Sequence, residues 1–150
     1  MKTKKSPLQI DNINITGCQL MTIMPNNDNE PLNNYDINMD FDTFSNEGLE
    51  NDMIVFLRVE GNDIENPVSG YCFSIISEAS ISFSKDIKEK DKSALISISA
   101  LQIIVSYVRG YIANITAYCP FGQYILPAID LNDLIKQKKE LINNQNKKED

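Results

Sequence analysis

The stretch YDINMDFD, residues Tyr35 to Asp42, has the strictest pattern in this chain of 150 residues. Every second residue from Tyr35 to Phe41 is large and apolar, and the residues between them are Asp or Asn. Successive side chains of a β-strand point to opposite faces of its sheet. The stretch therefore predicts a strand with one apolar side and one acidic side.

Two later segments repeat this alternation. In Met53–Gly61 (MIVFLRVEG) and Gly70–Ser84 (GYCFSIISEASISFS), apolar residues again occupy nearly every second position. The segment Leu8–Met24 is strand-like but less regular, and the long polar loop Pro25–Asn34 follows it. Together these segments predict a four-stranded antiparallel sheet with one face in water. No strand alternates with a helix, which argues against a parallel sheet.

The segment Ser93–Cys119 is too long for a strand, since strands of more than ~10 residues are uncommon. Its apolar residues recur at three-and-four spacing, which predicts a helix. Further apolar residues, such as Ile103 and Tyr107, lie on its other sides, so the helix must be buried on most faces. One sheet cannot cover all of them, and we expect a second subunit to do so. The residues predicted at that subunit interface are Leu101, Val105, Val108 and Ile112.

Pro120 is predicted to end this helix, and the loop Pro120–Ile129 that follows is unusually apolar. It either folds under the domain as a small core or lines a groove for apolar ligands. Asp130 can cap a last helix. The fold class is then α+β: a four-stranded antiparallel sheet with two C-terminal helices packed on one face. We expect one domain over residues 1–142 and a polar flexible tail over 143–150.

Composition excludes several function classes. A net charge of −7 opposes nucleic-acid binding, which depends on clustered Lys and Arg. The chain has no His, which removes the usual neutral-pH base and most zinc ligation. Its six Gly are isolated, so no phosphate-binding loop can form. We therefore predict a protein that is not an enzyme, with no catalytic residues, no metal and no cofactor.

Location follows from similar observations. The three Cys have no metal-site spacing and are expected to be reduced thiols. Three Lys near the start resemble the beginning of a signal peptide, but no apolar stretch follows them. Ser, Gln and Arg interrupt the longest apolar run, which argues against membrane insertion. These features predict a cytoplasmic protein.

The acidic row of Asp36, Asp40 and Asp42 allows three interpretations. It is a solvated face, a docking surface for a basic partner, or a pair of catalytic carboxylates about 7 Å apart. An open sheet face offers no cleft that would separate two carboxyl pKa values. The first two interpretations are therefore favoured.

Three short motifs resemble those of the SecB-type protein-export chaperones. They are YVRGYI at 107–112, CPFGQ at 119–123 and LPAIDL at 126–131. They are similar to the family's Tyr-x-Arg-x-x-Ile helix segment, its Thr-Phe-Pro-Gln turn and the Leu-Ala-Pro-Val-Asn-Phe entry to its last helix. The loop Pro25–Asn34 lies where the family has its crossover loop. The order of strands and helices agrees over most of the chain.

The resemblance implies an ATP-independent holdase that works as a homotetramer and holds unfolded or slowly folding polypeptides in apolar grooves. It also implies export by delivery to the SecA translocation motor, which docks on an acidic sheet face. Matched by position, the client-binding groove comprises Leu32, Tyr35, Phe121, Tyr124, Ile125 and Leu126. Matched by face, the SecA-type docking residues are Asp36, Asp40 and Glu78.

The sequence departs from the family in its first strand. Residues 13–18 read INITGC and carry no acid, whereas the family has an acidic strand there. This departure leaves two alternatives to SecA delivery open. One is a chaperone dedicated to a single client, such as the antitoxin of a toxin–antitoxin system. The other is a homo-oligomeric adaptor module without holdase activity. The identity of the clients and the choice between dimer and tetramer are not encoded in these patterns.

Overall fold

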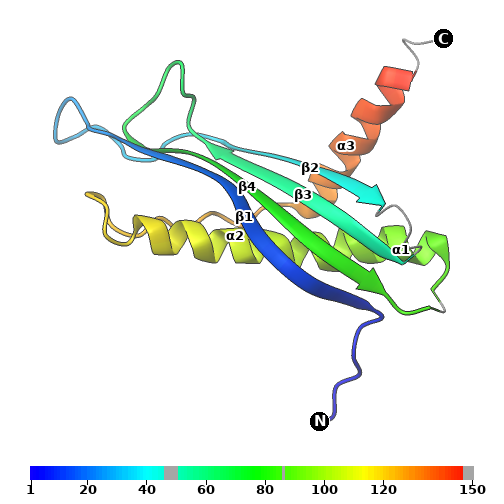
Figure 1. Ribbon diagram of the computed structural model, residues 1–150. Coiled ribbons are helices and arrows are strands. Elements are labelled where there is room, and N and C mark those ends of the chain that lie inside the picture. Colours follow the sequence, from blue (N-terminus) through cyan, green and yellow to red (C-terminus); the bar gives the residue numbers. More distant parts are fainter. Residues whose placement is uncertain (46–50, 86, 147–150) are drawn as a thin grey trace.

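The computed structural model describes residues 1–45, 51–85 and 87–146, and its centre is a four-stranded antiparallel sheet (Figure 1). The strands lie in the order β1-β4-β3-β2, so β1 and β2 form the two edges. Helices cover one face of the sheet (Figure 1). The predicted α+β fold class is confirmed. The strands are β1 (Leu8–Ile23), β2 (Ile37–Ser45), β3 (Asp52–Gly61) and β4 (Gly70–Phe83).

The alternation read from the sequence corresponds to the two faces of the sheet. Val55 and Val59 of β3 pair with Ala79 and Ile75 of β4, and all four side chains are fully buried. Burial of each Val- or Ile-sized side chain contributes about 1.5–3 kcal/mol. The side chains of Phe56 and Arg58, which alternate with them, face away from the helices. The inner face of β3 and β4 is therefore the floor of the core.

One long helical segment lies across this inner face. It comprises α1 (Glu89–Leu95), the π-helix η1 (Ile96–Ala100) and α2 (Leu101–Thr116). Helical structure was predicted over Ser93–Cys119, so the observed segment begins and ends earlier. The charged residues before Ser93 include Lys and Glu, which are good helix formers. At the other end Pro120 disfavours helical geometry in the residue before it.

The π-helix η1 connects two buried portions of this segment. The N–H group of Leu101 bonds to the carbonyl of Ile96, five residues earlier, instead of four. Ile96 and Leu101 are consequently both buried against the sheet. A π-turn holds more residues than an α-turn. The wider turn keeps one apolar stripe on the sheet on both sides of η1.

The predicted subunit-interface residues Leu101, Val105, Val108 and Ile112 belong to the core of the single chain. Their exposed fractions are 0%, 3%, 0% and 0%, so the assignment of these side chains to a subunit interface is wrong. The chain's own sheet covers the stripe. The apolar side chains that the same helical segment leaves exposed are Ile98, Ile103 and Tyr107.

The last helix, α3 (Leu131–Asn146), begins where the sequence predicted. The Oδ1 atom of Asp130 accepts hydrogen bonds from the backbone N–H groups of Asn132 at 3.0 Å and Asp133 at 3.2 Å. The helix extends to Asn146, past residue 143, where the polar tail was predicted to begin. Residues 147–150 lie outside the described part of the chain.

Within the described residues, one helical segment, Lys90–Thr116, has the length and apolar composition of a membrane span. The interrupting polar residues had argued against such a segment. Length and composition do not separate a membrane span from a helix that packs on a sheet, and this segment packs on one through Leu101 and Ile104.

Candidate functional site

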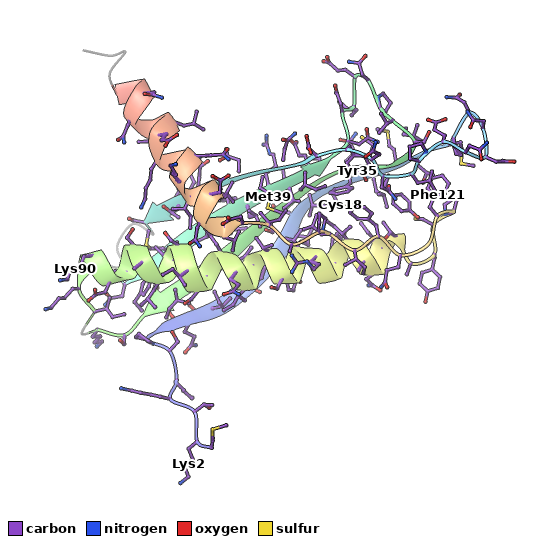
Figure 2. All side chains as sticks on the ribbon, turned by 180° about the vertical axis from the view of Figure 1, so that it is seen from behind. Lys2, Cys18, Tyr35, Met39, Lys90 and Phe121 are labelled. Carbon is purple, nitrogen blue, oxygen red and sulfur yellow. The ribbon has the colours of Figure 1, made fainter. Side chains whose placement is uncertain are left out.

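Two loops far apart in the sequence meet at one end of the sheet. The loop between β1 and β2 brings Leu32 and Tyr35, and the loop between α2 and α3 brings Phe121 and Tyr124. The Tyr35 and Tyr124 rings stack with centroids 6.4 Å apart. Figure 2 shows Tyr35 and Phe121 at this end, opposite Lys90. The predicted groove residues are therefore neighbours in space.

Their exposure divides them into three groups. Ile125 is 58% exposed and Leu32 is 41% exposed, so both offer apolar surface to a ligand. Tyr35, Phe121 and Tyr124 are half-buried. Leu126 is 1% exposed and belongs to the core, so its assignment to the groove is wrong. The side chain of Leu126 points into the core, and the backbone carbonyls of Leu126 and Pro127 accept hydrogen bonds from a residue of α2.

Arg109 on α2 is the residue that binds these two carbonyls. Its Nε donates to the carbonyl of Leu126 at 2.9 Å and its Nη2 to that of Pro127 at 3.1 Å. These residues belong to two of the motifs that resembled the SecB family. Their contact gives a structural reason for the Arg, to which the sequence pattern assigned no role. Arg109 is the only charged residue of α2, and this is the signal that could have indicated its role.

The first half of the same loop is fixed by two buried hydroxyl groups. Thr116 Oγ1 donates to the Ile112 carbonyl at 2.7 Å and accepts from the N–H of Tyr124 at 2.8 Å. Tyr71 Oη donates to the Gly122 carbonyl at 2.7 Å and accepts from the N–H of Phe121 at 3.1 Å. Each hydroxyl satisfies backbone groups that the irregular loop leaves unpaired. The loop is therefore held in a defined shape.

The loop between β1 and β2 is fixed by Asn33. Its N–H donates to the Ser69 carbonyl at 2.9 Å, and its Oδ1 accepts from the N–H of Tyr71 at 2.8 Å and from Tyr35 Oη at 3.1 Å. Asn33 has a φ of 57°, a left-handed conformation that Asn tolerates. Ser69 also donates to Glu30. Leu32 and Tyr35 thus project from a loop anchored on both sides.

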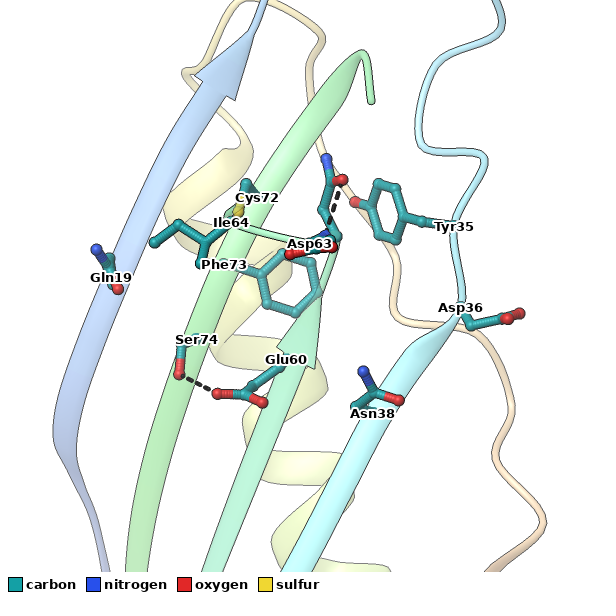
Figure 3. Close-up of a pocket in the computed structure, with 11 residues that line it drawn as sticks. Gln19, Tyr35, Asp36, Asn38, Glu60, Asp63, Ile64, Cys72, Phe73 and Ser74 are labelled. Atoms are coloured by element: carbon teal, nitrogen blue, oxygen red, sulfur yellow. Dashed lines mark hydrogen bonds between the residues drawn. The ribbon is translucent and has the colours of Figure 1, made fainter. Parts of the chain in front are cut away.

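A cavity of about 480 Å³ lies beside Tyr35, on the sheet face away from the helices (Figure 3). Its walls include the carboxylates of Asp36, Glu60 and Asp63 and the Phe73 ring. Ser74 Oγ donates to Glu60 Oε1 at 3.1 Å. A hydrogen bond from the Glu65 N–H lowers the pKa of Asp63. The cavity therefore remains anionic at neutral pH.

The predicted docking residues Asp36, Asp40 and Glu78 share this outer face. Asp40 stands opposite Arg58 on β3, and Glu78 stands opposite Phe56 in the next row. Lys138 of α3 reaches the same row, 2.8 Å from Asp40 Oδ1 and 2.9 Å from Asp42 Oδ1. Partial burial lowers the pKa of Lys138, but its hydrogen bonds to the two carboxylates outweigh that effect and raise the pKa overall. The negative charge of this face is thus partly neutralised.

We expect the aromatic end of the sheet to become less stable in alkaline solution. Burial, followed by the nearby Tyr124, raises the pKa of Tyr35, and burial raises that of Tyr124. Both phenols stay protonated in the folded chain above 10.0, the ordinary value at which they ionise when unfolded. Their contribution is complete below pH 10.0 and is lost as the pH rises toward the folded pKa values. Thermal unfolding followed by circular dichroism across this range measures the loss.

Tyr35→Phe should flatten this alkaline decline. Tyr118→Phe is the matched control, since Tyr118 is 96% exposed. An alkaline decline that is the same in Tyr35→Phe and the unmodified protein would contradict the assignment to Tyr35.

Comparison with solved structures finds a SecB-like chaperone of Mycobacterium tuberculosis, in complex with a ChAD peptide from the HigA1 antitoxin. The TM-score is 0.63 at 12% sequence identity, and the match covers 83% of this chain and 91% of that chain. The chain described here thus has a SecB-like fold. At this identity the likeness extends to the fold alone. No protein-family model and no curated protein matches the sequence.

Proposed function

We propose that this protein is an ATP-independent holdase chaperone that binds unfolded or slowly folding polypeptides. The observation that carries the proposal is the pair of exposed apolar side chains, Leu32 and Ile125, on two loops fixed by buried hydrogen bonds. A solvent-exposed loop without a binding role would more often carry polar residues at these two positions. The peptide in the Mycobacterium tuberculosis structure supports a polypeptide ligand for this fold.

The energetics suit weak and unspecific binding. Burial of one Leu- or Ile-sized client side chain is worth about 1.5–3 kcal/mol. One such contact gives a short-lived complex, and several contacts on one oligomer add by avidity. No sequence-specific polar contact is required for this apolar contribution, so other contacts have to distinguish one client from another.

A homotetramer provides this multiplicity. The helical segment keeps Ile98 65% exposed, Ile103 46% exposed and Tyr107 45% exposed, and a Cβ added at Gly110 would meet nothing within 4 Å. An apolar helix face with an open Gly suits close packing against a second copy. We propose that the subunit interface lies on this helix face. We also propose that the protein works in the cytoplasm of the cell.

For the physiological role, we favour a dedicated client, bound in addition to other unfolded chains, over delivery of clients to SecA. Of the three docking residues, Asp40 is already held by Lys138, which leaves Asp36 and Glu78. A docking surface for a basic motor is weaker with one of its acids neutralised. The antitoxin peptide bound to the Mycobacterium tuberculosis protein supports the dedicated alternative.

Aggregation suppression tests the proposal. Thermally unfolding citrate synthase is mixed with the protein without ATP, and light scattering follows aggregation and the mass of any complex. Suppression with a stable complex is expected. A well-folded oligomer that neither suppresses aggregation nor binds an apolar dye would instead indicate the adaptor module.

The double variant Leu32→Asp/Ile125→Asp should lose most client binding. Two charged groups in the proposed contact surface remove about 3–6 kcal/mol of apolar burial, which weakens the dissociation constant by at least about 100-fold. Both residues are exposed, so folding should be unaffected. The measurement is anisotropy titration of a fluorescent unfolded client. Leu141→Asp is the matched control, because Leu141 is 59% exposed and lies on α3. Equal affinity of the double variant and the control would place the binding surface elsewhere.

A further inference from the structure

The cavity beside Tyr35 opens on the outer face of the sheet where β2 and β3 stop pairing (Figure 3). The register of these two strands ends at the pair Ile37 and Gly61. Tyr35 and Asp36, which precede β2, line the cavity from one side, and Asp63, which follows β3, lines it from another. Its volume of about 480 Å³ is enough for a ligand of roughly ten non-hydrogen atoms, at about 30 Å³ for each water-sized group.

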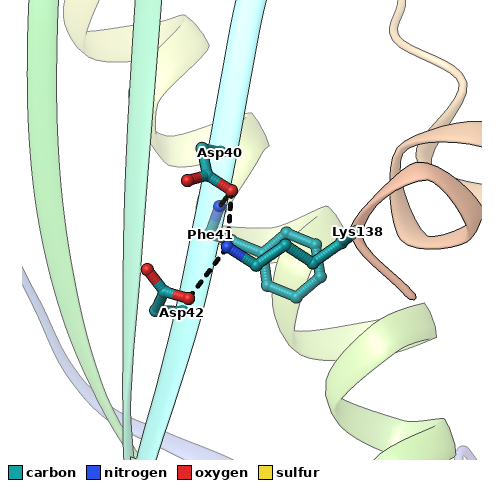
Figure 4. A network of polar contacts seen from close by, with 4 residues as sticks. All are labelled: Asp40, Phe41, Asp42 and Lys138. Carbon is teal, nitrogen blue, oxygen red and sulfur yellow. Dashed lines mark hydrogen bonds and ion pairs between the residues drawn. The ribbon is translucent and has the colours of Figure 1, made fainter. Parts of the chain in front are cut away.

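The walls of this cavity carry negative charge that the chain does not neutralise. The acidic residues that line it are Asp36, Glu60 and Asp63. In the part of the chain that the structure describes, no Lys or Arg lines the cavity, and no ion pair reaches these carboxylates. Asp40 and Asp42 on the same face differ, because Lys138 binds them at 2.8 and 2.9 Å (Figure 4). Since a cavity lined by one sign of charge attracts ions of the other, this one favours a cation.

Hydrogen bonds hold two of these carboxylates in place. Ser74 Oγ donates to Glu60 Oε1 at 3.1 Å, and the Glu65 N–H donates to Asp63 Oδ1 at 2.9 Å. The bond from Glu65 lowers the pKa of Asp63. A carboxylate has about four acceptor positions, so both groups can accept further hydrogen bonds from a ligand. The walls are thus arranged for a cation that donates hydrogen bonds.

Two aromatic rings distinguish the cavity from a solvated acidic patch. The rings of Phe73 and Tyr35 line it, and Ile64 of the hairpin between β3 and β4 adds an aliphatic side chain. A Cβ at Gly61 would lie 2.5 Å from Phe73 Cε1 and 3.0 Å from Tyr35 Cε2, so the position of both rings requires Gly there. Aromatic rings pack against apolar groups and attract cations to their faces. The cavity therefore suits a cation with an apolar body.

A buried thiol is a further group at this cavity that the fold leaves unused. Cys72 lines the cavity beside Ile64 and is 4% exposed (Figure 3). Among the described residues its thiol has no hydrogen-bond partner. Burial raises the pKa of Cys72, so the thiol is protonated and is a weak donor and a weak acceptor. Most buried polar side chains have a partner, and a bound ligand would supply one here.

We propose that this cavity is a binding site for a small organic cation, with a guanidinium or amidinium group on an aromatic or short aliphatic body. The head group donates to the carboxylates of Glu60 and Asp63, because planar cations of this kind form two parallel hydrogen bonds with a carboxylate. The body lies against the two aromatic rings. Neither Leu32 nor Ile125 lines the cavity, so the inference goes beyond the proposed holdase function.

Isothermal titration calorimetry with benzamidine, an amidinium group on a phenyl ring, tests the recognition of charge. The unmodified protein should bind it at one site per chain. Glu60→Gln/Asp63→Asn keeps the side-chain oxygens and removes both charges, so it should weaken binding at least about tenfold. Asp40→Asn/Asp42→Asn is the matched control on the same face. It should change the affinity by less than about twofold at physiological salt, because an ion pair already neutralises these residues and more distant charges are screened.

Two results of this titration would overturn the site. One is equal weakening in the two double variants, which would show general attraction to an acidic face. The other is the absence of saturable benzamidine binding by the unmodified protein.

Matched ligands test the chemical class. Benzyl alcohol keeps the ring without the charge and benzoate reverses the charge, so neither should bind at the concentrations at which benzamidine does. Acetamidine keeps the head group without the ring and should bind at least about fivefold more weakly. Binding of benzyl alcohol as strong as that of benzamidine would contradict the role of the carboxylates. Tighter binding of the tripeptide acetyl-Gly-Arg-Gly-amide than of benzamidine would rule out a small molecule as the ligand.

Amide chemical shifts locate the site in the unmodified protein, so this test does not depend on the folding of a variant. Benzamidine should shift the amide signals of Gly61, Ile64 and Cys72 and leave that of Ile125 unchanged. Shifts confined to the loop Pro120–Ile129 would place the ligand on the proposed client surface and would refute the cavity as its site.

Discussion

Replacement of Tyr71 with Phe is expected to lower the free energy of unfolding by roughly 2–4 kcal/mol, although it removes one oxygen atom. The Tyr71 side chain is 1% exposed, and its hydroxyl binds the Gly122 carbonyl and the Phe121 N–H. Phe leaves both backbone groups without a partner, and each such group costs about 1–3 kcal/mol when buried. The ring contact with Phe121, 5.6 Å between centroids, is kept. The loss is therefore due to hydrogen bonding and not to packing.

Urea unfolding followed by circular dichroism measures this loss. Tyr118→Phe makes the same chemical change at a residue that is 96% exposed, and it should alter the unfolding free energy by less than about 0.5 kcal/mol. Client affinity should also fall in Tyr71→Phe, since the loop that carries Ile125 loses its anchor. If the two variants unfold at the same urea concentration, the loop is not held by Tyr71.

Gly70→Ala should have an effect of similar size through the other loop. Gly70 has a φ of +127°, a region that residues with a Cβ rarely adopt. A Cβ there would lie 2.3 Å from Asn33 Oδ1 and 2.6 Å from the Asn33 nitrogen. Backbone strain of about 1–3 kcal/mol adds to the loss of Asn33 hydrogen bonds at about 0.5–1.5 kcal/mol each. We expect a loss of roughly 2–4 kcal/mol in urea unfolding and weaker client binding, because Leu32 and Tyr35 flank Asn33.

Gly122→Ala separates the two contributions. Gly122 also has a positive φ, +72°, but an added Cβ would meet nothing within 4 Å. Its cost should be the backbone strain alone, about 1–2 kcal/mol. Equal losses in the two variants would show that contact with Asn33 contributes nothing.

The strands were predictable because a period of two assigns each residue to a face directly. The pattern from Tyr35 to Phe41 placed the acidic side of β2 on the outer face without knowledge of its neighbours. The cap at Asp130 was predictable for a similar reason, since its partners are the next few residues. Both features depend on residues that are close in the sequence, so a local sequence pattern was sufficient to predict them.

The wrong assignments concern what covers an apolar surface. The spacing of Leu101, Val105, Val108 and Ile112 defines a stripe, but a stripe packs equally on a sheet of the same chain or on a second subunit. Leu126 was assigned to the groove with its neighbours, but its side chain is buried and Arg109 binds its backbone carbonyl. Burial depends on the rest of the fold, so the spacing of apolar residues in the sequence does not predict which surface covers them.

The residues that hold the site together were missed for a related reason. Tyr71 meets Phe121 across 50 positions of the chain, Asn33 meets Tyr71 across 38, and Lys138 meets Asp40 across 98. Each contact joins residues whose own surroundings give no sign of it. The unusual composition of Pro120–Ile129 and the resemblance to the SecB-type chaperones pointed to this end of the sheet in advance, but not to these contacts.

The π-helix η1 fixes the rotational phase of α1. An α-helix advances 100° per residue, and η1 contains one residue more than a regular turn would need to bring Leu101 above Ile96. A chain of the same length that formed a regular α-helix here would turn α1 by about 100° about its axis. Deletion of one residue from Ile96–Ala100 would instead convert the π-turn to an α-turn and keep α1 in phase with α2. Residues 96–100 thus set the rotation of α1 through the number of residues in the turn.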